Sequence, residues 1–188
     1  KNTQYMQKSS VSLVVNLVGL KEAVFNILGF KDNKEGREIL HKVIETAVDV
    51  GAKKGKELGD SVAICMTETE SSTRFATLDG EKYGKNSALN SMEGDSYSEG
   101  VVINASDVYD YTNKSDPISE CNKLSKLLNG GLSVVLNIDK DAKVAEIKKS
   151  IEKASQLTSS FKPVKTIAIC GECGFKDEPF EDKCPKCK

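Results

Sequence analysis

The 188-residue chain lacks tryptophan, and aromatic residues make up only 6% of it. Its 27 basic and 28 acidic residues nearly cancel and are mixed along the sequence, so there is no excess of positive charge for an electrostatic grip on nucleic acid. No apolar run approaches the roughly 20 residues of a membrane span, and no signal peptide is visible. These absences argue against a basic nucleic-acid binder and predict a cytoplasmic protein without a membrane part.

Cysteine is scarce before the last twenty residues of the chain. Only Cys65 and Cys121 occur in that part. We expect both to be packed thiols, because Cys65 falls inside an apolar strand and Cys121 on the apolar stripe of a helix. The only histidine, His41, is expected to be a surface or boundary residue without chemistry. The remaining cysteines form two Cys-x-x-Cys pairs with ten residues between them: Cys170, Cys173, Cys184 and Cys187.

Two such pairs predict a tetrahedral zinc site, because each pair can place both thiolates on one tight turn. Gly174 follows the first pair where a turn would need positive φ, and Pro185 lies inside the second. The polar segment 175–183 between the pairs is expected to form a short hairpin. Disulfides and a redox Cys-x-x-Cys are alternatives, but nothing else suggests a secreted protein and two matched pairs favour a metal. With four cysteine ligands, such a zinc would be structural.

Strands and helices are expected to alternate along the rest of the chain. Apolar runs predict strands at residues 11–17, 61–66, 101–104, 132–138 and 163–169, the first buried and the last leading directly into Cys170. Helical spacing and end signals predict helices at residues 20–28, from 33 or 34 to before 59, up to 78, from 117 to before 130, and 144–157. Continuously apolar strands between helices indicate a parallel α/β sheet or part of an α/β barrel.

The hydroxyl-rich elbow at residues 67–75 lies between the second strand and a helix that is expected to end at Asp79-Gly80. Ligands of parallel sheets bind at the carboxyl ends of the strands, which is where this elbow falls. Its backbone N–H groups, its hydroxyls and the positive end of the helix would suit an anion such as phosphate. Helix capping alone also explains the pattern, and the two interpretations are compatible.

Three motifs in order carry a resemblance to a known family. A strand ends in Gly-Leu-Lys-Glu-Ala at residues 19–23, Glu-Ser-Ser-Thr-Arg-Phe-Ala-Thr-Leu-Asp follows at 70–79, and the paired cysteines come last. Tyr-Thr-Asn-Lys-Ser at 111–115 adds a fourth, weaker match. Together they resemble the C-terminal part of the anaerobic (class III, glycyl-radical) ribonucleoside triphosphate reductases. The resemblance covers nearly the whole chain and is weak over most of residues 85–129.

The resemblance implies a fold and a site. Residues 1–168 would form a partial α/β barrel domain, the C-terminal half of a ten-stranded barrel of the glycyl-radical enzyme type, and residues 169–188 a four-cysteine zinc ribbon. The elbow would bind the phosphate of a ribonucleoside triphosphate substrate through Glu70, Ser71, Ser72 and Thr73. Structural Zn²⁺ would be bound by Cys170, Cys173, Cys184 and Cys187.

The resemblance also implies an activity, the reduction of ribonucleotides to deoxyribonucleotides for DNA replication by glycyl and thiyl radical chemistry. Its partners would be a radical S-adenosylmethionine activating enzyme, formate or a dithiol protein as reductant, the remainder of the reductase polypeptide, and a second copy in a homodimer. In the family an Arg-x-x-Gly-Tyr radical loop lies beyond the zinc cysteines and the thiyl cysteine lies upstream, and neither is found in this sequence. We therefore expect no catalytic residue in this chain and the radical glycine downstream of it.

Two other classes of function stay open at this stage. One is a zinc-ribbon interaction module with an α/β body and no catalysis, which the low aromatic content and balanced charge disfavour. The other is a glycyl-radical enzyme with a non-nucleotide substrate, which the reductase-like elbow and cysteine pattern disfavour.

Overall fold

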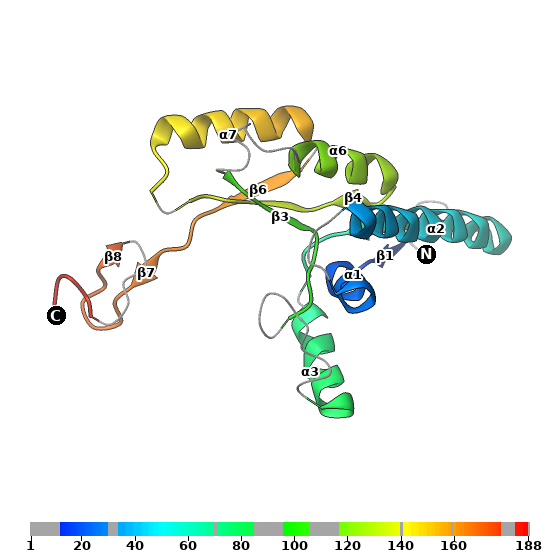
Figure 1. The fold of residues 1–188 in the computed structure, drawn as a ribbon, viewed down its shortest axis with the longest axis horizontal. Helices are drawn as coiled ribbons and strands as arrows, with labels where there is room; N and C mark the ends of the chain where they lie inside the picture. Colours follow the sequence, from blue (N-terminus) through cyan, green and yellow to red (C-terminus); the bar gives the residue numbers. More distant parts are fainter. Residues whose placement is uncertain are drawn as a thin grey trace, which may run out of the picture. The chain divides into compact units, whose positions relative to one another are not determined.

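The computed structural model describes residues 12–29, 34–69, 71–84, 96–105, 117–139, 141–158, 160–177 and 183–187 (Figure 1). The chain divides into two compact units. The first comprises residues 1–101 and 120–133, and the second comprises residues 102–119 and 134–188. Among the described helices, none is long and apolar enough to cross a membrane.

The first unit contains a three-stranded sheet with the order β1-β2-β4. Strand β1 (Ser12–Asn16) pairs in parallel with β2 (Ser61–Met66), which in turn pairs in parallel with β4 (Gly131–Leu132). The described helices of this unit are α1 (Leu20–Leu28), α2 (Lys34–Leu58), α3 (Ser71–Tyr83) and most of α6 (Pro117–Leu127). The predicted parallel α/β arrangement is therefore confirmed for this unit.

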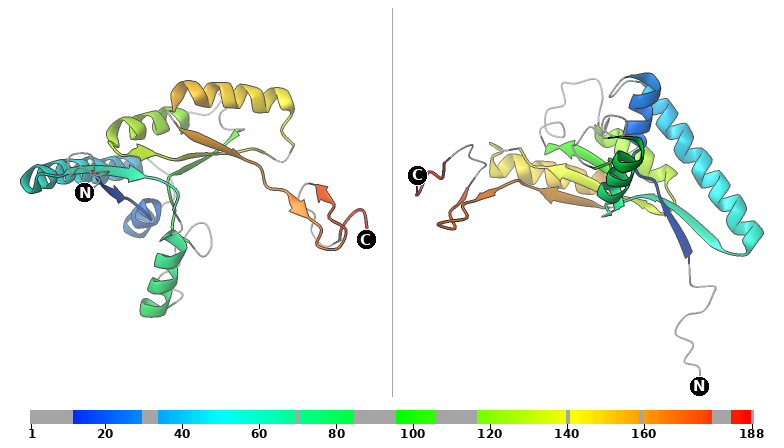
Figure 2. Two further views of the ribbon diagram at one scale, coloured as in Figure 1. Left: turned by 180° about the vertical axis from the view of Figure 1, so that it is seen from behind. Right: turned by 90° about the horizontal axis from the view of Figure 1, so that it is seen from below.

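Helix α2 lies along β2 and comes unusually close to it (Figure 2). Two glycines one turn apart permit this approach. A Cβ at Gly51 would lie 3.1 Å from Ile64 Cδ1, and one at Gly55 would lie 2.7 Å from the Asp60 carbonyl oxygen. Ile44 of α2 is fully buried, so this side of the helix forms a core with β2.

The second unit contains the sheet β3-β5-β6, in which β5 and β6 are parallel. These strands are β3 (Val101–Asn104), β5 (Val134–Asn137) and β6 (Phe161–Val164), and α7 (Val144–Leu157) contacts β6. The side chains of Val134 and Leu136 are buried in alternation along β5. The buried Ser150 hydroxyl of α7 donates a hydrogen bond to the Ala105 carbonyl oxygen at 3.3 Å.

Two predicted strands are in fact interrupted. The run 132–138 is split at Ser133 into β4 and β5, which belong to different sheets. Ser133 donates its N–H to the Met66 oxygen at 2.8 Å and accepts from the Val101 N–H at 2.9 Å, so its backbone bonds with two partners distant in sequence. The run 163–169 likewise consists of β6 and the separate β7 (Ala168–Ile169).

Two further expectations about elements are wrong. Helix α3 continues through Asp79-Gly80 to Tyr83 and is followed by Gly84 at φ 87°, so the left-handed turn lies four residues later than predicted. Strand β1 is not buried, since Leu13, Val14 and Val15 are 52%, 62% and 45% exposed. Consecutive residues of a strand point to opposite faces, so neither face of β1 is fully covered. β1 is also the edge strand of its sheet and pairs only with β2 among the described strands.

Candidate metal centre and elbow

The C-terminal segment folds into a tight turn around the first cysteine pair. Strands β7 and β8 (Lys176–Asp177) pair antiparallel on either side of it. The Cys170 N–H donates to the Phe175 oxygen at 2.9 Å, and the Gly174 N–H donates to the Cys170 oxygen at 3.0 Å. Gly174 has φ 68°, which confirms the predicted left-handed position. The hairpin thus encloses the first pair. Residues 178–182, in the segment where a hairpin was expected between the two pairs, lie outside the described residues.

The four cysteine sulfurs converge, with all of them within 4.8 Å of one another. The Sγ–Sγ distance is 3.6 Å both for Cys170 with Cys187 and for Cys173 with Cys184. A tetrahedron of sulfurs about 2.3 Å from a central zinc has edges of about 3.8 Å, whereas a disulfide needs about 2.05 Å. All four cysteines are free thiols, and the donor set fits a metal ion such as zinc.

The electrostatics of the cluster also suit a bound cation. Hydrogen bonds from the backbone N–H groups of Cys173 and Glu172 lower the pKa of Cys170 to about 6. Hydrogen bonds to Cys170, Cys184 and Cys173 raise the pKa of Cys187 to about 12. The pKa of Cys173 is also raised, because burial and hydrogen bonds to Cys184 and Cys170 outweigh the lowering by the Phe175 backbone. Cys173 and Cys187 therefore favour the protonated thiol in the absence of a cation, and a bound dication would favour the thiolate form of the ligands.

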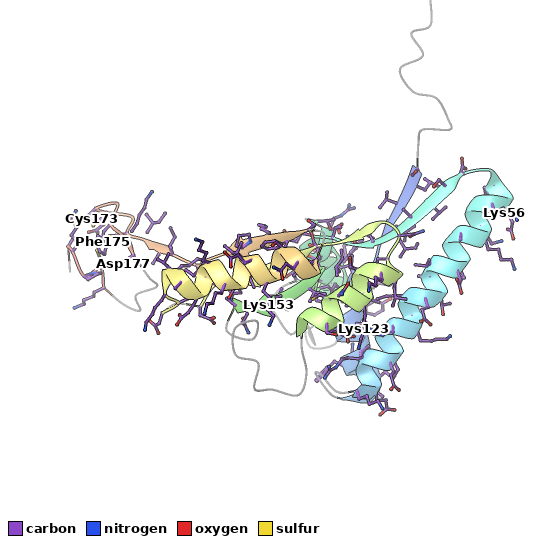
Figure 3. All side chains as sticks on the ribbon, turned by 90° about the horizontal axis from the view of Figure 1, so that it is seen from above. Lys56, Lys123, Lys153, Cys173, Phe175 and Asp177 are labelled. Carbon is purple, nitrogen blue, oxygen red and sulfur yellow. The ribbon has the colours of Figure 1, made fainter. Side chains whose placement is uncertain are left out.

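Figure 3 shows this C-terminal segment with the side chains of Cys173, Phe175 and Asp177 labelled. The Lys186 N–H points to Cys184 Sγ at 3.4 Å. Cys184 is the most buried of the four cysteines, at 8% exposure. Backbone N–H groups therefore support sulfurs in both pairs, as a closed structural site requires.

The elbow lies at the carboxyl end of β2, as predicted. The side chain of Asn16 fixes its first residue: the Thr67 N–H donates to Asn16 Oδ1 at 2.8 Å, and Asn16 Nδ2 donates to the Thr67 oxygen at 2.9 Å. Ser71 begins α3, Ser72 is 6% exposed and Thr73 is exposed. Glu70 lies outside the described residues. The structure therefore places three of the four predicted substrate-binding residues in the first turn of α3.

A carboxylate that sequence reasoning missed occupies the start of this helix. Glu99 Oε2 accepts a hydrogen bond from the Thr69 N–H at 2.6 Å. Its Oε1 accepts from the Thr69 hydroxyl at 2.5 Å and from the Ser72 N–H at 3.3 Å. Ser71 contributes a contact between its own hydroxyl and that of Thr69. The anion partner expected from the helix N-terminus is thus present, and it belongs to the chain itself.

Glu99 belongs to a strap, residues Tyr97–Glu99, that also contacts α1 and α3. The Ser98 N–H and hydroxyl donate to the two Glu22 oxygens at 2.9 and 2.6 Å, which satisfies a carboxylate that is only 2% exposed. The Tyr97 hydroxyl donates to Asp79 Oδ2 at 2.7 Å. That hydrogen bond to Asp79, together with burial, raises the pKa of Tyr97 to about 12.

Gly19 is the fourth point of contact with the strap. It donates its N–H to the Ser98 oxygen at 2.9 Å, and its φ of 74° is a conformation that favours glycine. The Tyr97 ring lies 3.5 Å from the position that a Cβ would take, which is ordinary van der Waals contact. Gly19, Glu22 and Asp79 all come from motifs that carried the resemblance. Their contacts with the strap explain, in structural terms, why these residue types occur at these motif positions.

The expected positions of Cys65, Cys121 and His41 agree with the structure. Cys65 and Cys121 are 2% and 1% exposed, so both are packed thiols. Cys65 Sγ also lies 3.4 Å from Asn16 Oδ1. His41 is half-buried on α2, with its Nε2 2.5 Å from Glu120 Oε1 of α6.

The geometry first defines a class: a mixed α/β chain with parallel-stranded sheets and a C-terminal four-cysteine cluster. Its fold is similar to a solved anaerobic ribonucleotide reductase, with a TM-score of 0.62 and 19% identity over 98% of this chain and 29% of that chain. The anaerobic ribonucleotide reductase from Thermotoga maritima, solved with glycerol in the active site, gives a TM-score of 0.58 and 19% identity over 93% of this chain and 28% of that one. No family model and no curated protein matches the sequence.

The fold is thus that of a part of anaerobic ribonucleotide reductases, and the resemblance drawn from the motifs is confirmed in the fold. The chain spans less than a third of the length of the two solved chains that it matches.

Proposed function

We propose that this chain is part of an anaerobic ribonucleoside triphosphate reductase, an oxidoreductase that makes deoxyribonucleotides for DNA replication. The observation that carries the proposal is the fold similarity, which extends over 98% of the chain. The ordered motifs and the four-cysteine cluster support it independently. Because the match covers only 29% of that chain, the glycyl and thiyl radical residues are proposed to lie outside this chain.

The exposed apolar side chains of β1 support a place within a larger barrel. A strand with three neighbouring residues at least 45% exposed would leave apolar surface in water, together with an edge that no other described strand pairs with. We propose that the remainder of the reductase polypeptide covers it and that residues 1–168 supply part of a ten-stranded barrel. A homodimer in the cytoplasm completes the proposed assembly.

Zinc has a structural role in this proposal. Cys170, Cys173, Cys184 and Cys187 would hold it, and four thiolates leave no coordination position for a substrate. The ion would cross-link two turns that are separated by ten residues in the sequence. Residues 169–188 would thereby become a rigid ribbon.

The elbow is proposed to bind substrate phosphate through Glu70, Ser71, Ser72 and Thr73. Its position at the carboxyl end of a parallel strand supports this role, as does the start of α3 within it. The contacts of Glu99 further support phosphate binding, because the N–H groups of Thr69 and Ser72 donate hydrogen bonds to an anionic group at the start of α3.

The proposal is tested with the complete reductase polypeptide. After activation by a radical S-adenosylmethionine enzyme, it should convert ribonucleoside triphosphates to deoxyribonucleoside triphosphates with formate or a dithiol protein as reductant. Electron paramagnetic resonance should first establish that the glycyl radical has formed. A radical-bearing preparation that yields no deoxyribonucleotide with either reductant would contradict the proposal.

A further inference from the structure

Glu99 places a negative charge where the proposed substrate phosphate would lie. Its carboxylate accepts hydrogen bonds from both the N–H and the hydroxyl of Thr69 and from the N–H of Ser72. A phosphate oxygen that used these donors would have to replace a carboxylate oxygen, because each N–H offers one hydrogen. The two anions would also repel each other at this short range.

The backbone of the strap that carries the Glu99 carboxylate is held in place by hydrogen bonds of the two preceding residues. Ser98 is held by two hydrogen bonds to buried Glu22, and the Tyr97 hydroxyl is held by Asp79. These anchors do not involve the elbow. Rotation of the Glu99 side chain alone would therefore free the Thr69 and Ser72 donors while Tyr97 and Ser98 stay in place.

The elbow also keeps its shape without a ligand because of Glu99. A helix start with unsatisfied N–H groups frays or recruits water, whereas here a carboxylate satisfies them. The donors are thus already oriented before an anion arrives, which reduces the ordering cost of binding.

We propose that Glu99 is an internal competitor that occupies the anion position of the elbow in the free protein and is displaced by the polyphosphate of the substrate. This inference rests on the proposed phosphate-binding role of the elbow. It predicts that anions bind with an affinity reduced by the need to expel Glu99. A polyphosphate, with more charge and more acceptor oxygens, is better able to do so than a single phosphate.

The test measures inorganic tripolyphosphate binding to the full chain by titration calorimetry. Glu99→Gln removes the competing charge with little change in shape and should bind tripolyphosphate about tenfold more tightly than the wild type. Glu81→Gln is the matched control, because it removes one exposed negative charge from the same helix away from the elbow. Its affinity should equal that of the wild type.

The outcomes separate this inference from the function on which it rests. Equal or weaker binding by Glu99→Gln, with measurable binding by the wild type, would overturn the competition and leave the elbow as a phosphate site. Absence of binding by both would overturn the phosphate site and the competition together. If Glu99→Gln does not fold, Glu99→Ala gives the same test, because it removes the carboxylate and its charge altogether. This variant should also bind more tightly than the wild type.

Discussion

Replacement of Cys184 by serine should weaken zinc binding about a hundredfold. Cys184 is the most buried member of the cluster, and its Sγ lies 3.6 Å from that of Cys173, close to the edge of about 3.8 Å that a zinc tetrahedron requires. A serine hydroxyl is a poor zinc ligand at neutral pH because it stays protonated, so three thiolates would remain.

The size of the effect follows from the number of ligands. Structural zinc sites in small domains bind with about 10–16 kcal/mol near pH 7. An equal division among four cysteines assigns roughly 3 kcal/mol to each, which corresponds to an affinity roughly a hundredfold weaker for the variant. The reduced wild-type chain should contain one zinc ion by elemental analysis, and a chromophoric chelator should extract it much more readily from Cys184→Ser.

Cys121→Ala is the control for this experiment, since Cys121 is a buried thiol of α6 outside the cluster. That variant should lose some stability to the small cavity it creates but should keep one zinc ion. A reduced wild-type protein without metal would refute the reasoning, and so would a Cys184→Ser variant that holds zinc as tightly as the wild type.

Four other outcomes follow from the structure. Ser71→Asp should weaken nucleotide binding by the complete enzyme about tenfold or more through repulsion of phosphate, relative to the neutral control Ser71→Asn, and equal affinities would leave the elbow as a capped helix. Tyr97 should titrate near pH 12 by ultraviolet absorbance and nearer to 10 in Asp79→Asn; since its pKa is raised in the folded protein, the stability it contributes should be complete below pH 10 and lost between 10 and 12. Gly80→Ala should stabilise α3 by about 0.5–1 kcal/mol in denaturant unfolding, because nothing lies within 4 Å of the new Cβ. Gly100→Ala should cost more than about 2 kcal/mol, because φ is +60° and the Cβ would lie 2.5 Å from a carbonyl oxygen; similar effects of the two glycine substitutions would contradict this account.

The features that the sequence predicted well are those encoded by neighbouring residues. Helix α1 spans Leu20–Leu28 and is closed by Gly29 at φ 68°, and α7 spans Val144–Leu157, in both cases as the apolar spacing indicated. The cysteine cluster was equally accessible, because each Cys-x-x-Cys pair fixes two ligands through a local turn. Local spacing and turn residues suffice for such elements.

The features that could not be predicted from the sequence depend on contacts between residues that are far apart in the chain. The division between β4 and β5 arises at Ser133, whose backbone forms hydrogen bonds with Met66 and Val101. The apolar run is therefore continuous in sequence, but its strand pairing is interrupted at this residue. The exposure of β1 depends on which segments cover its faces, and apolar composition alone cannot reveal that. Glu99 gave no signal at all, since it is one acidic residue in a polar stretch and acts on a helix start 27 residues earlier in the sequence.

The strap changes the meaning of the motifs that pointed to the family. In the sequence, Gly19 and Glu22 belong to the first motif, after β1, and Asp79 belongs to the second, on α3. In the structure all three contact Tyr97 or Ser98, so their residue types are explained by a polar cluster that holds the strap in place. The same cluster fixes the backbone from which Glu99 reaches the elbow. The two motifs are therefore linked physically through a segment that no motif marked, and binding at the elbow would depend on residues of α1 that never touch the ligand.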